Sequence, residues 1–254
     1  MTETFAALLF AHVLADFVFQ TGWMAQGKQT CTPGPMALHI AIVAAAAALV
    51  LGTVAWPVAV LTAMHLAIDI AKSFTPQRRL WPFLADQAAH VASLILIAFW
   101  VPDLWTGAPW AAGFWAGTVG PEVLWLLDVL PALMALMAGA ILTTRAGGFA
   151  IGLLMAPWAE AALPEGLPNG GKLIGLLERG LIFLLVLVGQ PAGIGFLIAA
   201  KSVLRFETAS KDQKAGEYVI VGTLASFGWA LAITYATVSL MAELPPVGLP
   251  LPTP

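Results

Sequence analysis

Histidine and aspartate side chains recur at one-turn spacing in the first part of the chain. The 254-residue sequence holds four histidines, each in a different apolar segment. Three of them stand four residues from an aspartate. Because residues four apart share one face of an α-helix, each pair is expected to point the same way. The pairs are His12–Asp16, His65–Asp69 and Asp86–His90, and the remaining histidine is His39.

These residue types are ligands of divalent metal ions. Imidazole nitrogens and carboxylate oxygens bind Zn²⁺ and Fe²⁺, and a histidine ligand often donates its other N–H to a carboxylate. Four imidazoles and three carboxylates suffice for one or two ions, and an ion with an open position would activate water for hydrolysis. No catalytic residue is assigned. The predicted ligands are His12, Asp16, His39, His65, Asp69, Asp86 and His90, with Gln20, Lys72 and Gln87 in support.

Three other interpretations of these residues stay open. A buried His–Asp–Gln network could fix the register of the helices without metal. The same groups could line an ion or proton path in a transporter. Two histidines could also hold a haem, although a carboxylate one turn from each histidine suits an apolar haem pocket poorly.

The elements that must position these side chains are membrane helices. The chain is 60% hydrophobic and only 10% charged, whereas a soluble domain carries about 25% charged residues. The net charge of -3, without a basic arm, argues against a nucleic-acid partner. We predict an all-α, polytopic transmembrane helix bundle with about eight spans. The spans are expected at 4–23, 36–54, 57–75, 83–101, 122–143, 172–190, 192–207 and 217–241.

Lysine and arginine in the short loops predict the orientation of the chain. Lys28 lies in the first loop, and Lys72, Arg78 and Arg79 lie in the third, whereas the second and fourth loops have neither residue type. The positive-inside rule then puts the N-terminus outside and the first and third loops in the cytoplasm. With this orientation, the His/Asp groups converge in the cytoplasmic half of a four-helix bundle over residues 1–105.

A repeat inside this bundle is compatible with the sequence. "LLFAHVLAD" (8–16) aligns with "LTAMHLAID" (61–69), and "ALHIA" (37–41) resembles "AAHVA" (88–92). Two copies of a two-helix hairpin would follow, although Pro35 stands where a counterpart of Asp86 would be.

Residues 106–254 are predicted to form a C-terminal transmembrane region with a cytoplasmic basic loop. The Gly-rich segment 146–158 either extends the fifth helix, lies in the interface or re-enters the membrane. The Pro-rich tail 243–254 cannot be helical and is expected to dangle outside the cytoplasm. Four cations could bind an anion or a lipid head group, unless they merely reach the interface or pair with Glu178. They are Lys172, Arg179, Lys201 and Arg205.

Several motifs resemble a bacterial family of polytopic membrane proteins known as a domain of unknown function. They are "HVLADFVFQTGWMAQGK", "HLAID", "DQAAH", "GKLIGLLERGLIF", "GFLIAAKSVLRF" and "EYVIVGTLAS". The closest resemblance covers about residues 5–105, and it implies that the His/Asp set and the Lys201–Arg205 segment are family features. A looser similarity links the H-x3-D pairs to membrane-embedded metal-dependent hydrolases.

These features together predict a bacterial inner-membrane protein with a divalent metal site, of Zn or Fe, near the cytoplasmic face. Hydrolysis of an amphiphilic or lipid-linked substrate is the first functional hypothesis. An ion- or proton-coupled transporter is the second, and a non-catalytic membrane scaffold is the third. Membrane lipid is the expected partner, and homo-oligomerisation is left open.

Overall fold

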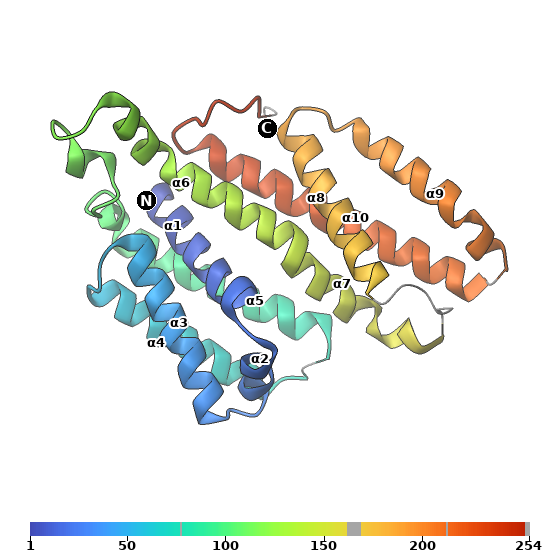
Figure 1. Cartoon of the computed structure of the whole chain (residues 1–254). Coiled ribbons are helices and arrows are strands. Elements are labelled where there is room, and N and C mark those ends of the chain that lie inside the picture. Colours follow the sequence, from blue (N-terminus) through green and yellow to red (C-terminus); the bar gives the residue numbers. More distant parts are fainter. Residues whose placement is uncertain (77, 162–168, 212, 252–254) are drawn as a thin grey trace. The chain divides into compact units, whose positions relative to one another are not determined.

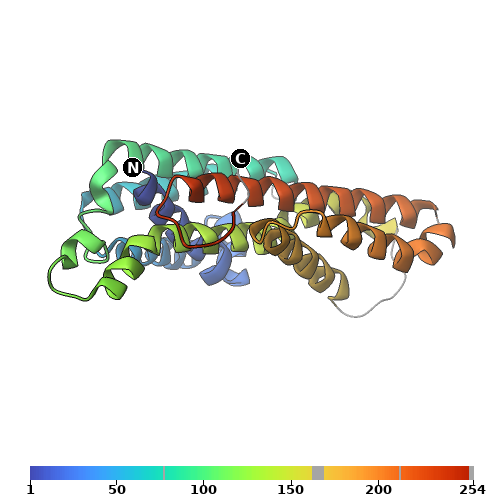
Figure 2. The same ribbon diagram turned by 90° about the horizontal axis from the view of Figure 1, so that it is seen from above.

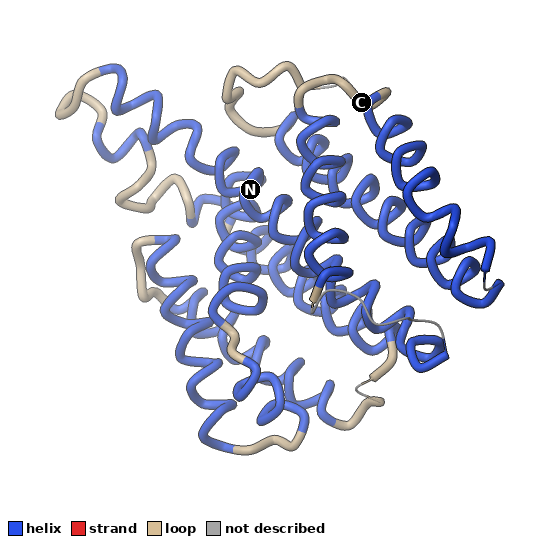
Figure 3. The backbone as a smooth tube through the Cα atoms, turned by 45° about the vertical axis from the view of Figure 1, so that its right-hand side comes forward, coloured by secondary structure: helices blue, strands red, loops and turns tan. Residues whose placement is uncertain are grey.

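The computed structural model describes residues 1–76, 78–161, 169–211 and 213–251, and the side chains of 160–161 and 204–211 lie outside the described part. Over these residues the chain forms helices and loops, and no strand occurs (Figure 3). The predicted all-α fold is therefore confirmed.

Each of the eight predicted spans is helical in the structure. Five helical runs are long and apolar enough to cross a membrane, namely Thr2–Phe19, Pro33–Leu51, Leu80–Trp100, Pro121–Ala159 and Gln213–Ala242. The helices of the other three predicted spans are not among these five. The long helices are α1 (Thr2–Val13), α3 (Pro33–Leu51), α4 (Trp56–Ser73), α5 (Leu80–Trp100), α6 (Pro121–Ile141), α8 (Gly170–Leu187), α9 (Gly193–Lys211) and α10 (Gln213–Ala242).

The Gly-rich segment after the fifth predicted span extends that span. Helix α6 continues through a π-helical segment η4 (Leu142–Ala146) into α7 (Gly147–Met155) and the 3-10 segment η5 (Ala156–Ala161). Of the three alternatives for residues 146–158, the structure therefore selects extension of the helix.

The chain divides into two compact units. Unit 1 comprises Met1–Ala138 and Leu240–Val247, and unit 2 comprises Gly139–Ser239 and Gly248–Pro254. Unit 1 contains all four histidines and the whole of the predicted 1–105 bundle.

Four helices of unit 1 form a closed ring around one interior (Figure 1). Helix α1 packs against α3 and α5, and α4 also packs against α3 and α5. The short helix α2 (Gly22–Gln29) contacts α3 and α4. One half of this interior is an apolar core that includes Leu8, Leu51, Leu61, Leu94 and Ile97. Since every helix of the ring carries one histidine, all four can face the same interior.

The first membrane helix ends earlier than predicted. We expected it to run to residue 23, but it passes into a π-helical segment η1 (Leu14–Phe19) and stops. Gln20 is extended (φ -68°, ψ 115°), and the Thr21 side chain accepts a hydrogen bond from the Met24 N–H at 3.3 Å. Thr21 is therefore the N-cap of α2. A separate helix thus begins where the first span was predicted to continue.

The outer surface of the helices is apolar. Many large hydrophobic side chains are mostly exposed, among them Leu49, Phe74, Phe99, Phe196 and Val203. Buried positions, by contrast, include charged groups. An apolar exterior around a partly polar interior suits lipid as the surrounding solvent.

The C-terminal tail is not helical beyond Ala242 in its described part, as its prolines predict. Leu244 is nevertheless buried. The start of the tail therefore packs against the protein, and the expectation that it dangles is wrong there.

Unit 2 consists of η4, α7, η5, α8, α9 and most of α10. Helix α8 packs on η4, α7 and α9. Figure 2 shows α8 inclined to α9 and α10. Asn169 begins α8 in a left-handed conformation (φ 60°), which agrees with the predicted Asn-Gly-Gly turn.

Candidate metal centre

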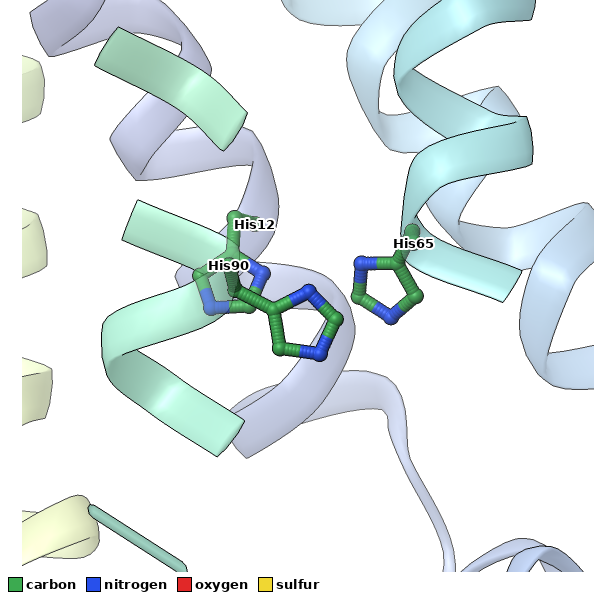
Figure 4. Close-up of side chains that lie close together, drawn as sticks. All are labelled: His12, His65 and His90. Atoms are coloured by element: carbon green, nitrogen blue, oxygen red, sulfur yellow. The ribbon is translucent and has the colours of Figure 1, made fainter. Parts of the chain in front are cut away.

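The four histidine rings lie next to one another inside unit 1. The centroid of His65 is 4.0 Å from that of His90 and 5.2 Å from that of His39. The centroid of His12 is 4.9 Å from that of His90 and 5.6 Å from that of His65. Figure 4 shows His12, His65 and His90 facing one another from α1, α4 and α5. All four rings are buried.

Two histidines and two aspartates form a compact group of four possible ligand atoms. His39 Nε2 and His65 Nε2 are 3.1 Å apart. Each lies 3.4 Å from Asp16 Oδ1 and 3.5 Å from Asp69 Oδ2. Zinc bonds of about 2.0–2.1 Å put the ligand atoms of a regular tetrahedron about 3.3–3.4 Å apart. Five of the six separations are therefore close to those of a tetrahedral site, and Asp16, His39 and His65 form one group whose ligand atoms all lie within 4.8 Å of one another.

A second group of ligand atoms adjoins the first. His90 Nε2 lies 3.5 Å from Asp86 Oδ1 and 3.7 Å from Asp69 Oδ1. Asp69 thus presents one oxygen to each group. His12 stands beside His90, and its Nε2 is 3.4 Å from Gln87 Oε1. The Gln87 amide also donates a hydrogen bond of 3.0 Å to Asp86 Oδ2.

Lys28 belongs to the cluster, although the sequence analysis used it only as evidence of orientation. Its Nζ lies 2.7 Å from Asp69 Oδ1 and 3.1 Å from His39 Nε2, and it donates a 3.0 Å hydrogen bond to Gln20 Oε1. Lys28 is only 7% exposed. The sequence did contain a signal for this role. Lys28 closely follows the predicted polar face of the first helix, and the chain has few other charged residues.

The predicted supporting residues all lie at this site. Lys72 forms an ion pair with Asp86 and keeps 26% of its side chain exposed. Gln20, expected on the same helix face as His12 and Asp16, instead follows the end of that helix and reaches the cluster through Lys28.

Three carboxylates and two ammonium groups meet in this buried site. One protonated histidine or one bound cation would balance their charge. Several buried polar atoms of the site have no hydrogen-bond partner among the described residues, including Asp16 Oδ1, Asp86 Oδ1 and His90 Nε2. A buried charge normally has a partner. The described residues therefore form His/Asp groups that could hold a metal ion.

The cations predicted to bind an anion lie in unit 2 and have different surroundings. Lys201 Nζ pairs with Glu178 Oε2 at 2.7 Å, which is the interhelical salt bridge considered as an alternative. Arg179 is buried, whereas Lys172 is exposed. The Arg205 side chain lies outside the described residues. Sequence reasoning missed the exposed Arg145 nearby.

The comparisons with known proteins concern the part of the chain that holds the His/Asp cluster. No curated protein and no solved structure matched the chain. One family model, described as "Protein of unknown function (DUF3307)", matches residues 4–110. The expected resemblance of the N-terminal part to an uncharacterised domain is thereby confirmed.

Proposed function

We propose that unit 1 binds a divalent metal ion between α1, α3 and α4, inside the membrane. The observation that carries this proposal is the set of 3.1–3.5 Å separations among His39 Nε2, His65 Nε2, Asp16 Oδ1 and Asp69 Oδ2. Imidazole and carboxylate atoms at this spacing are compatible with the ligand sphere of a small ion. An ion there would also offset the carboxylate charge of the cluster when the histidines are neutral.

The ligand chemistry favours Zn²⁺, with Fe²⁺ as the alternative. Imidazole nitrogen is a borderline donor and carboxylate oxygen is a hard one, and both ions accept this mixture. Tetrahedral geometry with four protein ligands is the usual arrangement for zinc. Calcium and magnesium prefer six or more oxygen ligands, which this group does not provide.

A second ion would use Asp86 and His90 and share Asp69 with the first. Asp69, whose Oδ2 faces the first group and whose Oδ1 faces the second, would contribute a ligand to both ions. These three ligands leave room in the coordination sphere, whereas the first position has four protein ligands. The second position is therefore the better candidate for chemistry.

The reaction that best suits this site is hydrolysis of an amphiphilic or lipid-linked substrate. A metal ion with an open position polarises an ester or phosphoester and makes water a better nucleophile. Lys72, whose side chain is 26% exposed, pairs with Asp86 Oδ2 and would hold that carboxylate in place. Gln87 donates a hydrogen bond to the same oxygen, and the other oxygen, Oδ1, faces His90. The apolar exterior would deliver a substrate from the bilayer.

The proposed location is the inner membrane, with the metal site near the cytoplasmic face. Lys28, Arg78 and Arg79 in the first and third loops support this orientation through the positive-inside rule. Membrane lipid is the partner that follows.

Metal analysis of the purified full-length protein tests the proposal. Cells grown with added zinc or iron should yield protein with one to two equivalents of metal by mass spectrometry. His39→Ala should lose at least one equivalent, because it removes a ligand of the four-atom group. Asp103→Asn, an exposed aspartate outside the cluster, is the matched control and should keep the full content.

Zinc-edge X-ray absorption gives a second measurement that does not depend on variants. It should show nitrogen and oxygen neighbours at about 2.0–2.1 Å, with histidine ring scattering. Folded wild-type protein that contains no metal after growth in either metal would contradict the proposal. That result would favour the scaffold, in which the polar groups only specify packing.

Ion- or proton-coupled transport is the second candidate, and Lys28 favours it. Its ammonium contacts Asp69 and His39, two of the proposed ligands, so ammonium and metal ion would compete for the same atoms. Competition of this kind is expected where a bound ion must be released. Flux into proteoliposomes that follows an ion gradient would support transport, and metal-dependent hydrolysis without flux would exclude it.

A further inference from the structure

Unit 2 contains a cavity of about 960 Å³. It is lined by η4, α7, the N-terminal half of α8, Lys201 of α9 and the first half of α10. This volume lies in the range of sites for small organic molecules, about 300–1,000 Å³. The metal cluster of unit 1 contributes no lining residue.

A buried arginine contributes to the wall of this cavity. Arg179 is only 4% exposed. Its Nε and one terminal nitrogen donate hydrogen bonds of 3.2 and 2.9 Å to the Thr144 carbonyl, and the other terminal nitrogen donates one of 3.2 Å to Ser226 Oγ. A guanidinium has five N–H groups, so two remain for a ligand.

Arg179 forms no direct ion pair with an acidic side chain among the described residues, and the charge of Glu178 acts on it without a salt bridge. Its neighbour Glu178 is engaged by Lys201 at 2.7 Å. The acceptors of Arg179 are neutral, a carbonyl and a hydroxyl. Buried arginines are normally paired with an anion. The guanidinium in the cavity wall is therefore available for a direct ion pair with an anionic ligand.

The backbone around Arg179 is shaped to accommodate the guanidinium. A Cβ at Gly175 would lie 3.0 Å from one terminal nitrogen, and a Cβ at Gly148 would lie 3.2 Å from the other. The π-helical turn η4 presents the carbonyl of Thr144 to Arg179 instead of using it only within the helix. These features hold the guanidinium in one position, as a binding site requires.

Further positive groups line the same cavity. Arg145 and Lys172 are exposed lining residues, and the Lys201–Glu178 pair also lines it. The described lining thus has four cations and one carboxylate. The start of α8, with Gly170 and Gly171, adds backbone N–H groups at a helix N-terminus, which favour negative charge.

We propose that this cavity binds the phosphate group of an anionic amphiphile. Phosphate suits the arginine fork and the additional cations, because it accepts several charge-assisted hydrogen bonds. Most other lining residues are apolar, including Phe149, Ile151, Leu153 and Ile174, so they would contact a hydrocarbon chain. This site goes beyond the proposed metal function, since it uses other residues and stands without a metal ion.

Calorimetric titration of the full-length protein in a neutral detergent and phosphate-free buffer tests the proposal. The probes are dihexanoyl phosphatidic acid, inorganic phosphate and zwitterionic dihexanoyl phosphatidylcholine. We expect saturable, one-to-one binding of phosphatidic acid, at least about tenfold tighter than either other probe. If inorganic phosphate binds as tightly as phosphatidic acid, the cavity is an anion site, but the proposal that its ligand is an amphiphile is wrong.

Variants of the cavity cations make the test specific. Arg179→Gln should weaken binding of phosphatidic acid by about tenfold or more, and Arg145→Gln by about threefold or more. The exposed Arg145 gives a usable result even if Arg179→Gln does not fold. Arg79→Gln, an exposed arginine outside the cavity, should leave the affinity unchanged. Wild-type affinity in both cavity variants, or equal binding of phosphatidylcholine, would overturn the proposal.

Discussion

Asp69 uses its two carboxylate oxygens in different ways. Oδ2 lies 3.5 Å from the Nε2 atoms of His39 and His65. Oδ1 lies 2.7 Å from Lys28 Nζ and 3.7 Å from His90 Nε2. Asp86, in contrast, belongs only to the group around His90. Under the proposed metal function, the two aspartates therefore have unequal importance.

This difference gives a prediction at the scale of single residues. Asp69→Asn should abolish binding of both metal ions, because it removes a ligand from each position. Asp86→Asn should remove only the second ion and leave about one equivalent. The measurement is metal content per folded protein by mass spectrometry, with size-exclusion chromatography as the check on folding. Equal metal content in the two variants would contradict the sharing of Asp69.

Two elements depart from regular α-helix next to buried polar groups, one in each unit. The π-helical turn η1 contains Asp16, and η4 presents Thr144 to Arg179. Single π-helical turns within α-helices frequently lie at functional sites. The first helix ends after η1, and α2 packs against α3 and α4. This packing brings Lys28 into the cluster.

The packing of α2 on α3 depends on Gly27. A Cβ added there would lie 2.2 Å from Pro35 Cβ, whereas a Cβ at Gly34 would meet no atom within 4 Å. Gly27→Ala should therefore destabilise the fold by about 1–3 kcal/mol, as overpacking does. Thermal unfolding in detergent, followed by circular dichroism, should show a lower midpoint for Gly27→Ala than for the control Gly34→Ala. Identical midpoints would show that α2 is not held by this contact.

The sequence predicts these elements well where local pattern determines them. Long apolar runs predict the eight helical segments, and one-turn His/Asp spacing predicts which side chains share a helix face. The early end of the first helix at Phe19 was missed, because a π-turn is stabilised by contacts with distant residues rather than by local hydrophobicity. Burial of Lys28 and Arg179 was missed for the same reason, since their partners Asp69 and Ser226 are distant in sequence.

At the scale of the whole molecule, the orientation in the membrane is the property that follows most directly from charge. The first loop, with Lys28, is predicted to be cytoplasmic, and the second, with no lysine or arginine, to be outside. Cys31 is the single cysteine of the chain, lies after α2 in the first loop and is exposed. The natural sequence therefore carries its own topological probe.

A membrane-impermeant maleimide should label Cys31 in inverted membrane vesicles and leave it unlabelled in intact spheroplasts. The reason is that the reagent reaches the cytoplasmic face only in inverted vesicles. As a control, Val54→Cys in a Cys31→Ser background should give the opposite result, because Val54 is exposed in the second loop. Labelling of Cys31 in intact spheroplasts would reverse the proposed orientation and put the His/Asp cluster near the outer face.

The position of Lys28 has a consequence for how this protein would be assembled. Many small metal domains unfold when their ion is chelated, since nothing else neutralises the ligands. Here an ammonium group already contacts Asp69 and His39. On the proposed function, the bundle would reach its final form before any ion arrives and would survive its removal. When metal is scarce in the cell, the protein would then lose its activity but stay folded, and it would not be degraded.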